Sequence, residues 1–372
     1  MLSRIPMLDL AAEWMEVGSE VEAAVLRVLR SGHFVLGPET EAFEREMAVL
    51  TGTRFCVGVG SGTEALWLSL VALGVGPGCE VVTSGFTYFA TVEAILWTGA
   101  QPVFADIEAG SFNLDPGALE VALGPRTRAI LPVHLFGRCA DMSRIRTLAD
   151  QHGIPVLEDA AQAIGAARAG RRAGAWGRAG CFSFYPSKNL GAAGDAGCVT
   201  TDDDDLADQL RLLRAHGCRT RDDHRVRGTT SRLDSVQAAV LRAKLPRLAA
   251  WTAARTRIAA RYAELLSDVP GLRLPGAGPD EVHAWNQYTV RCEDPAAIRA
   301  ALDAEGVEWR HYYPLPAYRQ HALGAARLPV GSCPEVERAC AQVISLPIHP
   351  SLDDASIERV ARAVRRGAQA DH

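Results

Sequence analysis

The feature that most restricts the fold is a regular alternation of short apolar stretches with longer helical segments in the first half of the chain. The apolar stretches are 80–83, 102–105, 128–133 and 155–158, and the helical segments are 87–97, 116–123 and 142–152. Such alternation is typical of an α/β protein with a mostly parallel sheet. Because ligands of open parallel sheets bind beyond the carboxyl ends of the strands, we expect the functional residues there.

Polar residues follow several of these predicted strands, namely Thr87, Tyr88, His134, Asp159 and Gln162. Singly, Tyr88 could be a packing aromatic and His134 a core histidine whose hydrogen bonds are satisfied. Asp159 follows a strand that should be buried on both faces, where an unpaired carboxylate is costly. It therefore needs a cationic partner, and a protonated pyridine nitrogen and an arginine both meet that need. In a helix, Gln162 would share a face with Asp159.

The stretch 181–197, CFSFYPSKNLGAAGDAG, holds a single lysine among small and apolar residues. The apolar residues at its start predict a buried strand, so Lys188 would emerge from a strand end into a partly dry site. Desolvation there lowers the pKa of an amine and frees its lone pair for Schiff-base chemistry. The glycines at 191, 194 and 197 allow tight turns and a close approach of a ligand. A surface lysine in a glycine-rich loop is the ordinary alternative.

A possible anion site follows the strand predicted at 55–59, where the sequence GSGTEALWLSLVALG begins. A strand, a turn of small residues and a helix direct backbone N–H groups and the positive end of the helix dipole at an anion. Ser61, Gly62 and Thr63 would cradle a phosphate, or they could simply cap a core helix. The turn is not a dinucleotide fingerprint, because Thr63 occupies the place of its third glycine, and no Walker lysine follows.

Length and composition indicate a soluble globular protein of two domains, with 372 residues, a net charge of -5 and 48% hydrophobic residues. We expect a larger domain over 1–245 and a smaller one over 246–372, joined through the Gly- and Pro-rich segment 270–279. The acidic balance gives no indication of a nucleic-acid partner. No CxxC pair occurs among the nine cysteines and no apolar run is long enough for a membrane span. These features predict reduced thiols, no metal site and a cytoplasmic location.

Nine segments, in order along nearly the whole chain, resemble the sugar aminotransferases of the DegT/DnrJ/StrS group, which are pyridoxal-phosphate enzymes of fold type I. The segments are GSGTEAL, TSGFTYFATVEAI, FNLDPGALE, PVHLFGRCADM, VLEDAAQAIGA, the stretch 181–197, TSRLDSVQAAVL, HYYPLP and ISLPIHP. The resemblance implies a large domain with a mostly parallel seven-stranded sheet between helices, and a smaller C-terminal α+β domain. It also implies a homodimer with its sites at the subunit interface.

The resemblance assigns the cofactor site residue by residue. Lys188 would form the Schiff base and later move the proton between the substrate carbon and C4′ of the cofactor, while Asp159 would keep the pyridinium protonated, as an electron sink requires. The other cofactor contacts implied are Tyr88 stacked on the ring, Gln162 at the phenolic oxygen, and Gly62, Thr63 and Ser183 at the phosphate.

Two regions around this site are less completely matched. In the family, an asparagine of the second subunit also reaches the phosphate, but here Thr230 of GTTSRLD occupies that position with a shorter side chain. The resemblance places Arg232, His311, Tyr312 and Tyr313 in the sugar-nucleotide pocket. Packing or solvent-facing roles are their ordinary alternatives.

The retained lysine also separates amino transfer from a dehydratase subgroup in which histidine replaces it. We expect ping-pong transfer from an amino acid, glutamate or glutamine, to a keto group of a nucleotide-activated deoxysugar. The segments IPMLDLAAEW and GTTSRLD are more similar to relatives that act at C3 than to those that act at C4. A keto-uronic sugar, with Arg232 at its carboxylate, is equally admissible. The alternatives from other classes are a non-catalytic regulator that binds the same ligands and, disfavoured by the broken GxGxxG, a nucleotide-binding oxidoreductase.

Overall fold

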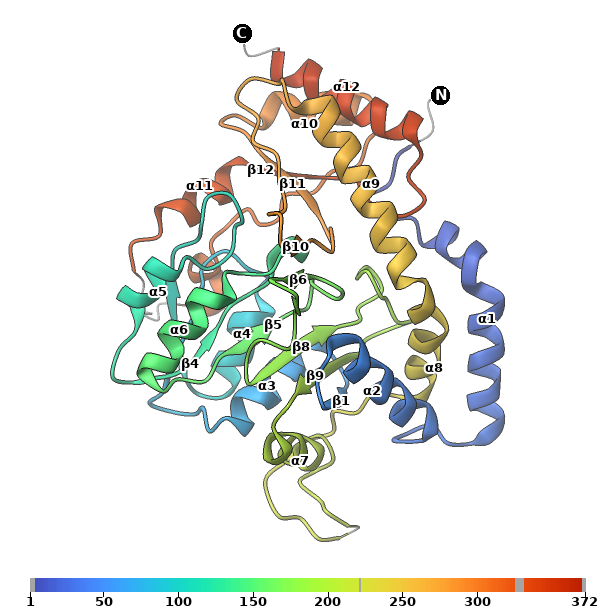
Figure 1. Ribbon diagram of the computed structural model, residues 1–372, viewed down its shortest axis with the longest axis vertical. Coiled ribbons are helices and arrows are strands. Elements are labelled where there is room, and N and C mark those ends of the chain that lie inside the picture. The colour runs from blue at the N-terminus through green and yellow to red at the C-terminus, as the bar shows by residue number, and fades with distance from the viewer. Residues whose placement is uncertain (1–3, 221, 325–330, 370–372) are drawn as a thin grey trace.

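The computed structural model describes residues 4–220, 222–324 and 331–369. Its helices are α1 (Leu10–Ser31), α2 (Pro38–Thr51), α3 (Gly62–Ala72), α4 (Ala90–Trp97), α5 (Pro116–Ala122), α6 (Met142–His152), α7 (Asp204–Leu213), α8 (Ser235–Lys244), α9 (Leu248–Leu266), α10 (Ala296–Ala304), α11 (Pro334–Gln342) and α12 (Asp354–Gln369). Figure 1 shows them around and above a central sheet. None of the described helices is long and apolar enough to cross a membrane.

The central sheet contains the strands β1 (Phe55–Val59), β2 (Glu80–Ser84), β3 (Gln101–Ala105), β4 (Thr127–Leu131), β5 (Leu157–Asp159), β8 (Ala179–Ser183) and β9 (Gly197–Thr201). Their order is β1-β9-β8-β5-β4-β2-β3, where parallel bridges such as Val133 to Asp159 join β4 to β5. Strand β9 runs antiparallel to both neighbours, and the remaining pairs are parallel. The expected mostly parallel seven-stranded sheet is confirmed.

Alternate residues of the strands face two helical layers, as the two-residue period of a strand requires. On one face, Val81 and Leu131 belong to a core with α3, α4 and α7. On the other face, Val82 and Ile130 pack with α5 and α6, and Phe182 packs with α2 and α8. Helices therefore cover both faces of the sheet, so the strand ends, with their polar side chains, are the place for a site.

The C-terminal part forms a smaller unit above the sheet (Figure 1). The helical pattern over 231–262 predicts an interruption at Pro246. It is confirmed, because a single 3-10 turn, η2 (Leu245–Arg247), contains Pro246 and joins α8 to the long helix α9. Helix α9 leads to the antiparallel pair β11 (Tyr288–Arg291) and β12 (Val343–Leu346), which shares a core with α10 and α12. Before β11 the chain forms β10 (Glu281–Val282), which pairs with β6 (Ala167–Arg168); β6 in turn pairs with β7 (Arg171–Arg172).

The helix limits differ from the sequence prediction in three places. Helix α4 begins at Ala90, so Thr87 and Tyr88 lie in the turn before it rather than in its first turn. Residues 160–165 form successive turns, closed by bonds such as Ala163 N–H to the carbonyl of Ala160, and not a helix. The predicted helical face shared by Asp159 and Gln162 is therefore wrong. The helical pattern at 205–216 predicts a helix that ends at 216, whereas α7 ends at Leu213.

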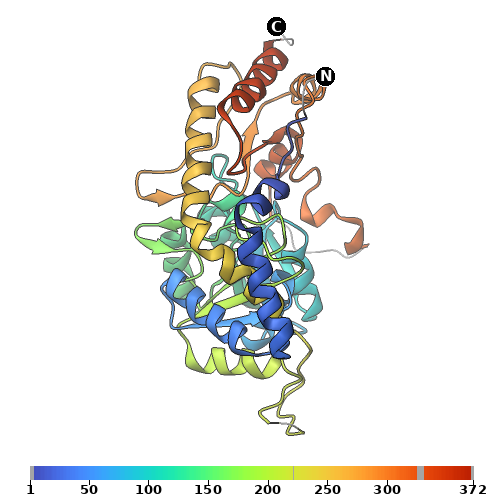
Figure 2. The same cartoon turned by 90° about the vertical axis from the view of Figure 1, so that its right-hand side faces the viewer.

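An irregular arm follows α7 and protrudes from the body in both views (Figures 1 and 2). It covers 214–230, of which 221 lies outside the described residues, and isolated antiparallel bridges join Ala215 to Thr230 and Cys218 to His224. The charged residues 219–230, which lack periodicity, predict a long exposed loop, and the described residues of this range confirm it. The arm returns to the body at Ser231, just before α8.

Candidate active site

Lys188 lies in a turn just beyond the carboxyl end of β8. Its backbone N–H donates to the carbonyl of Tyr185 at 2.8 Å, and the side chain is half-buried. Burial lowers the pKa of Lys188 to about 8, against the opposing effect of the Asp159 charge. The amine is therefore neutral far more often near physiological pH than that of an ordinary lysine, as the sequence argument expects.

Asp159 ends β5, the strand next to β8, and its side chain is buried. Its Oδ2 accepts from Thr91 Oγ1 at 2.8 Å and its Oδ1 accepts from the N–H of Ala161 at 3.1 Å. Burial raises the pKa of Asp159, while these two hydrogen bonds and the charge of Lys188 oppose the rise. Among the described residues no arginine forms an ion pair with Asp159, so the arginine alternative has no support here.

The sequence argument missed Thr91, whose hydroxyl contacts Asp159 directly. Thr91 lies in the first turn of α4, and its Oγ1 is 2.8 Å from that of Thr87 in the preceding turn. The two hydroxyls thus form a chain that ends at the buried carboxylate. Their four-residue spacing, directly after a predicted strand, was the available signal.

The start of α3 lies against the ends of β8 and β9. Ser61 caps the helix by accepting from the N–H of Glu64 at 3.2 Å. A Cβ atom added to Gly62 would lie 2.6 Å from the Cβ of Ser183, and one added to Gly197 would lie 2.4 Å from the carbonyl carbon of Ser61. Glycine at both positions therefore permits an approach that a side chain would prevent. The structure brings Gly62 and Ser183 together, with Thr63 following in the helix.

Gln162 uses both ends of its amide within the protein. Its Oε1 accepts from the N–H of Phe136 at 2.7 Å, and its Nε2 donates to the hydroxyl of Tyr313 at 3.1 Å. Tyr313 comes from the C-terminal part, and its ring centroid lies 6.3 Å from that of Tyr88. Tyr88 is 63% exposed, so its side chain is open to a ligand. The structure thus joins Gln162, Tyr313 and Tyr88 at one edge of the site.

The other residues expected at the substrate are less close to one another. His311 Nε2 donates to the carbonyl of Cys340 at 2.6 Å and its Nδ1 faces an Arg299 nitrogen at 3.4 Å, so both ring nitrogens have partners. Burial lowers the pKa of His311. This geometry favours a packing role. Tyr312 contacts Tyr313, with ring centroids 5.6 Å apart. Arg232 is half-buried at the base of the arm.

Thr230 lies on the exposed arm, where its Oγ1 is 2.7 Å from Nε2 of His216. No hydrogen bond within the described parts of the chain links it to Gly62, Thr63 or Ser183. The next residue, Ser231, does reach α3, because its Oγ accepts from the N–H of Gly60 and donates to Glu64.

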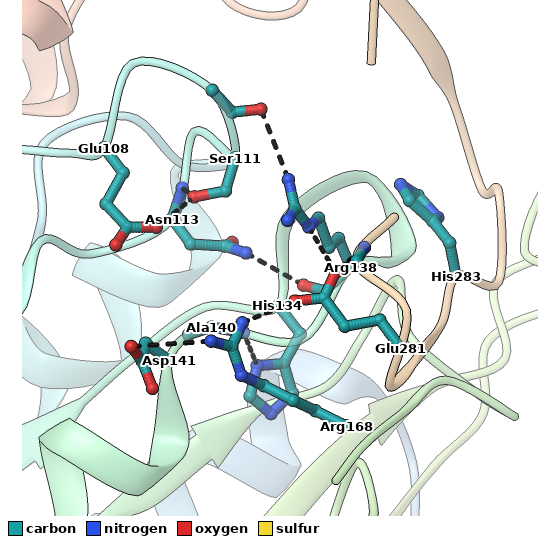
Figure 3. A network of polar contacts seen from close by, with 12 residues as sticks. Glu108, Ser111, Asn113, His134, Arg138, Ala140, Asp141, Arg168, Glu281 and His283 are labelled. Atoms are coloured by element: carbon teal, nitrogen blue, oxygen red, sulfur yellow. Dashed lines mark hydrogen bonds and ion pairs between the residues drawn. The ribbon is translucent and has the colours of Figure 1, made fainter. Parts of the chain in front are cut away.

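His134 is a core histidine with both nitrogens satisfied, which was its ordinary alternative. Its Nδ1 accepts from the N–H of Ala140 at 3.1 Å and its Nε2 donates to the buried carboxylate of Glu158 at 2.8 Å. Above it, Glu281 of β10 bridges Arg138 and Arg168 at 2.8 and 2.5 Å (Figure 3). Burial would raise the pKa of Glu281, but the bonds from Arg138 and the N–H of Gly278 lower it. Glu281 thus connects the segment before β11 to the turn after β4, through Arg138, and to β6, through Arg168.

Within this α/β fold, the half-buried Lys188 lies just beyond β8, close enough to the buried Asp159 for their charges to interact, an arrangement that suits an enzyme with a reactive amine. The whole chain then supplies the family. It belongs to the DegT/DnrJ/EryC1/StrS aminotransferase family, whose model matches residues 16–365. The expected resemblance is confirmed, and the protein is an aminotransferase.

Individual relatives agree with this membership. The chain is 47% identical over 366 residues to dTDP-3-amino-3,4,6-trideoxy-alpha-D-glucose transaminase of Streptomyces venezuelae, covering 98% of this chain and 97% of the relative. It is 42% identical to UDP-2-acetamido-2-deoxy-3-oxo-D-glucuronate aminotransferase of Pseudomonas aeruginosa, covering 97% and 99% of the two chains. The crystal structure of S. venezuelae DesV in complex with a ketimine intermediate has a TM-score of 0.95 and 47% identity, and the match covers 98% and 99% of the chains.

Proposed function

We propose that the protein transfers an amino group from an amino acid to a keto group of a nucleotide-linked sugar, with pyridoxal phosphate as its cofactor. The observation that carries the proposal is the arrangement of Lys188 and Asp159 at the ends of neighbouring strands. Burial sets the amine pKa to about 8, where it can both accept and release a proton. The aminotransferase family and the ketimine-bound structural relative support the same chemistry.

The residues present fit the cofactor at both of its charged ends. Gly62, Thr63 and Ser183 would hold the phosphate, because the start of α3 presents backbone N–H groups beside Ser183 and the glycine leaves room for close approach. Asp159 would face the ring nitrogen, since its buried carboxylate forms no ion pair among the described residues. When bound, pyridoxal phosphate supplies an electron sink for the substrate carbon.

The chain's own groups then divide the work. Lys188 Nζ would hold the cofactor covalently and would move the proton at the reacting carbon. Thr91 holds the Asp159 carboxylate through Oδ2, and Thr87 holds Thr91. Tyr88 presents an exposed ring to cover the cofactor plane. Gln162 would donate to the phenolic oxygen through the second N–H of Nε2, while the first donates to Tyr313 and Oε1 accepts from Phe136.

The substrate proposal follows the names of the relatives. Both the 3-amino product of one and the 3-oxo substrate of the other place the reacting group at C3 of the sugar. We therefore favour C3 over C4, with glutamate or glutamine as the amino donor. One relative acts on a dTDP-linked deoxysugar and the other on a UDP-linked uronic acid, so both classes belong in the assay. Arg232, Tyr312 and Tyr313 would line the sugar side, and His311 supports them.

A second copy of the chain would complete the site. Exposed apolar residues gather on α1 and the loop after it, at Leu10, Trp14, Met15, Leu26, Leu29, Phe34, Val35 and Leu36. Such a surface suits burial against another subunit. The arm that carries Thr230 protrudes from its own body (Figure 2), and would reach the phosphate of the partner. We place the homodimer in the cytoplasm, where its mostly buried thiols stay reduced.

The direct test is a panel of 3-keto and 4-keto nucleotide sugars, with dTDP or UDP and with or without a C6 carboxylate, incubated with glutamate and the purified enzyme. Mass spectrometry of the products should show an amino sugar from a 3-keto substrate. Amination of 4-keto sugars alone would overturn the C3 proposal. Cofactor binding without any conversion by glutamate or glutamine would instead support the regulator.

A further inference from the structure

The residue that follows the reactive lysine has a buried side chain with partners at both ends of its amide. Asn189 is 5% exposed; its Nδ2 donates to the carbonyl of Ala284 at 2.6 Å, and its Oδ1 accepts from Nδ2 of Asn286 at 3.0 Å. Asn286 is itself 7% exposed. These bonds join the lysine turn to the segment that leads into β11, almost one hundred residues further along the chain.

That segment is firmly held by the 3-10 turn η1 (Leu135–Gly137), which follows β4 of the large sheet. The N–H of Ala284 donates to the carbonyl of Gly137 at 2.8 Å, and the N–H of Gln287 donates to that of Phe136 at 3.2 Å. A few residues earlier, Glu281 is held by Arg138 and Arg168 (Figure 3). Asn189 therefore bonds to a segment that is itself held by several hydrogen bonds and ion pairs.

The same segment carries the opposite edge of the site. A Cβ atom added to Gly137 would lie 2.9 Å from the backbone nitrogen of Asn286 and 3.1 Å from the carbonyl oxygen of Gln162. The neighbouring Phe136 donates its N–H to the Gln162 side chain. The turn at 136–137 thus packs between Gln162 and the segment that holds Asn189, and it links the position of the lysine to that of the glutamine.

Two further bonds hold the lysine turn on either side of Asn189. The N–H of Lys188 donates to the carbonyl of Tyr185 at 2.8 Å, and the carbonyl of Gly191 accepts from Nζ of Lys244 at 2.8 Å. Both bonds involve the backbone of the turn, and neither involves the side chain of Lys188. Asn189 is the side chain in this turn that connects it to the segment before β11.

We propose that Asn189, through Ala284 and Asn286, is a positioning residue that fixes the point at which the Lys188 amine enters the site. The proposal rests on the proposed function, in which Lys188 is the residue that binds the cofactor. If the lysine turn moved, the buried amide of Asn189 and its partners would lose their hydrogen bonds and stay unsatisfied. The two bonds therefore strongly favour one position of the turn's backbone. With the backbone held there, the amine occupies its half-buried position instead of extending into water.

The experiment uses the apoprotein and reads the lysine directly. Wild type, Asn189→Ala, Asn189→Asp and Asn286→Ala are acetylated with trace acetic anhydride across a pH series, and peptide mass spectrometry gives the fraction modified at Lys188. Asn189→Asp keeps the acceptor for Asn286 but removes the donor to Ala284, so it separates the two bonds. Tyr262→Phe is the matched control, because it removes a buried hydrogen bond to the carbonyl of Pro347 far from the lysine turn.

In the wild type, half-maximal reactivity should occur near pH 8. Release of the turn lets the amine reach water, so Asn189→Ala should move this midpoint up by about one pH unit, which is about a tenfold loss of reactive amine below the midpoint. Asn286→Ala should give a smaller shift in the same direction, and Asn189→Asp an upward shift to which the charge of its own carboxylate beside Lys188 adds. Tyr262→Phe should lower the midpoint of thermal unfolding without changing the pH of half-maximal reactivity at Lys188.

An unchanged lysine midpoint in Asn189→Ala and in Asn286→Ala, with thermal stability lowered as in Tyr262→Phe, would show a purely structural role and overturn the proposal. If Asn189→Ala does not fold, Asn286→Ala decides by the same readout. A separate control adds pyridoxal phosphate and borohydride to the wild type. Absence of the reduced adduct on Lys188 contradicts the proposed function but leaves the acetylation result for Asn189 standing.

Discussion

Asp159 and Lys188 stand at the ends of adjacent parallel strands, and each shifts the pKa of the other. The carboxylate raises the pKa of the amine and the ammonium lowers that of the carboxyl, but burial is the larger influence on both. The net result is an amine that titrates at about 8 beside an acid whose pKa lies above its usual range. Neither group fully compensates the burial of the other, so each can interact with a further group.

The pH dependence of stability should reveal this desolvated lysine. Because the folded pKa of Lys188 is about 8 and its ordinary value is 10.5, the folded chain binds that proton more weakly than the unfolded chain. The contribution of Lys188 to the free energy of unfolding should therefore rise between these two pH values. Urea denaturation of the apoprotein and of Lys188→Met, from pH 7 to 10.5, measures it. The wild type should have a lower free energy of unfolding than Lys188→Met, by an amount that shrinks as pH rises. A constant difference would contradict the lowered pKa of Lys188.

Thr91→Val should weaken the hold on the buried aspartate. The substitution keeps the shape of the side chain but removes the donor to Asp159 Oδ2. We expect a loss of about 1 to 2 kcal/mol in stability and about tenfold weaker binding of pyridoxal phosphate. Thr98→Val, at the other end of α4, removes a hydroxyl bond to the carbonyl of Ile95 and serves as the control. Equal cofactor affinities in the two variants would refute a role for Thr91 at the site.

Gly62→Ala should separate the start of α3 from β8. The new methyl group would lie 2.6 Å from the Cβ of Ser183, so the helix must move away. Overpacking of this kind costs about 1 to 3 kcal/mol, and the phosphate site should open. Isothermal calorimetry should show weaker binding of pyridoxal phosphate but little change for pyridoxal. Gly276→Ala, with no atom within 4 Å of the added Cβ, is the control.

Two inactive variants should restore activity when mixed, if the arm acts across subunits. Lys188→Ala lacks the reactive amine, and Thr230→Trp places a bulky side chain on the arm. In a mixed dimer, the intact lysine of one subunit would face the intact Thr230 of the other, so one of the two sites works again. Activity should recover on refolding the two variants together and not when they are refolded separately. No recovery, with mixed dimers demonstrated by mass, would show that Thr230 does not act on the partner's site.

The strands could be predicted because apolar runs mark buried strands. The polar residues after them were expected at one edge of the sheet, and the roles of Asp159, Lys188 and Gly62 followed from the family resemblance. The partners of Gln162 could not be predicted, since one is the backbone of Phe136 and the other a tyrosine 151 residues away. Contacts of this range depend on how the C-terminal part packs.

The helix boundaries and the contact between the hydroxyls of Thr87 and Thr91 could not be predicted, for a related reason. Periodicity placed Thr87 inside a helix, whereas the structure puts it in the turn before α4, from where its hydroxyl reaches Thr91. Likewise, the turns at 160–165 follow from bonds to neighbouring strands, such as Ala160 N–H to the carbonyl of Cys181, and not from local propensity. No local signal marks Asn189, because its partners lie in a distant segment.

The central claim is that Lys188 binds pyridoxal phosphate and carries the amino transfer, and absorbance spectroscopy tests it most directly. The wild type mixed with the cofactor should show the band of the lysine-bound form at the edge of the visible range, and glutamate should replace that band with the spectrum of the amine form. Lys188→Ala should lack the band and should not turn over. If Lys188→Ala aminates a keto sugar at the wild-type rate, the claim is wrong.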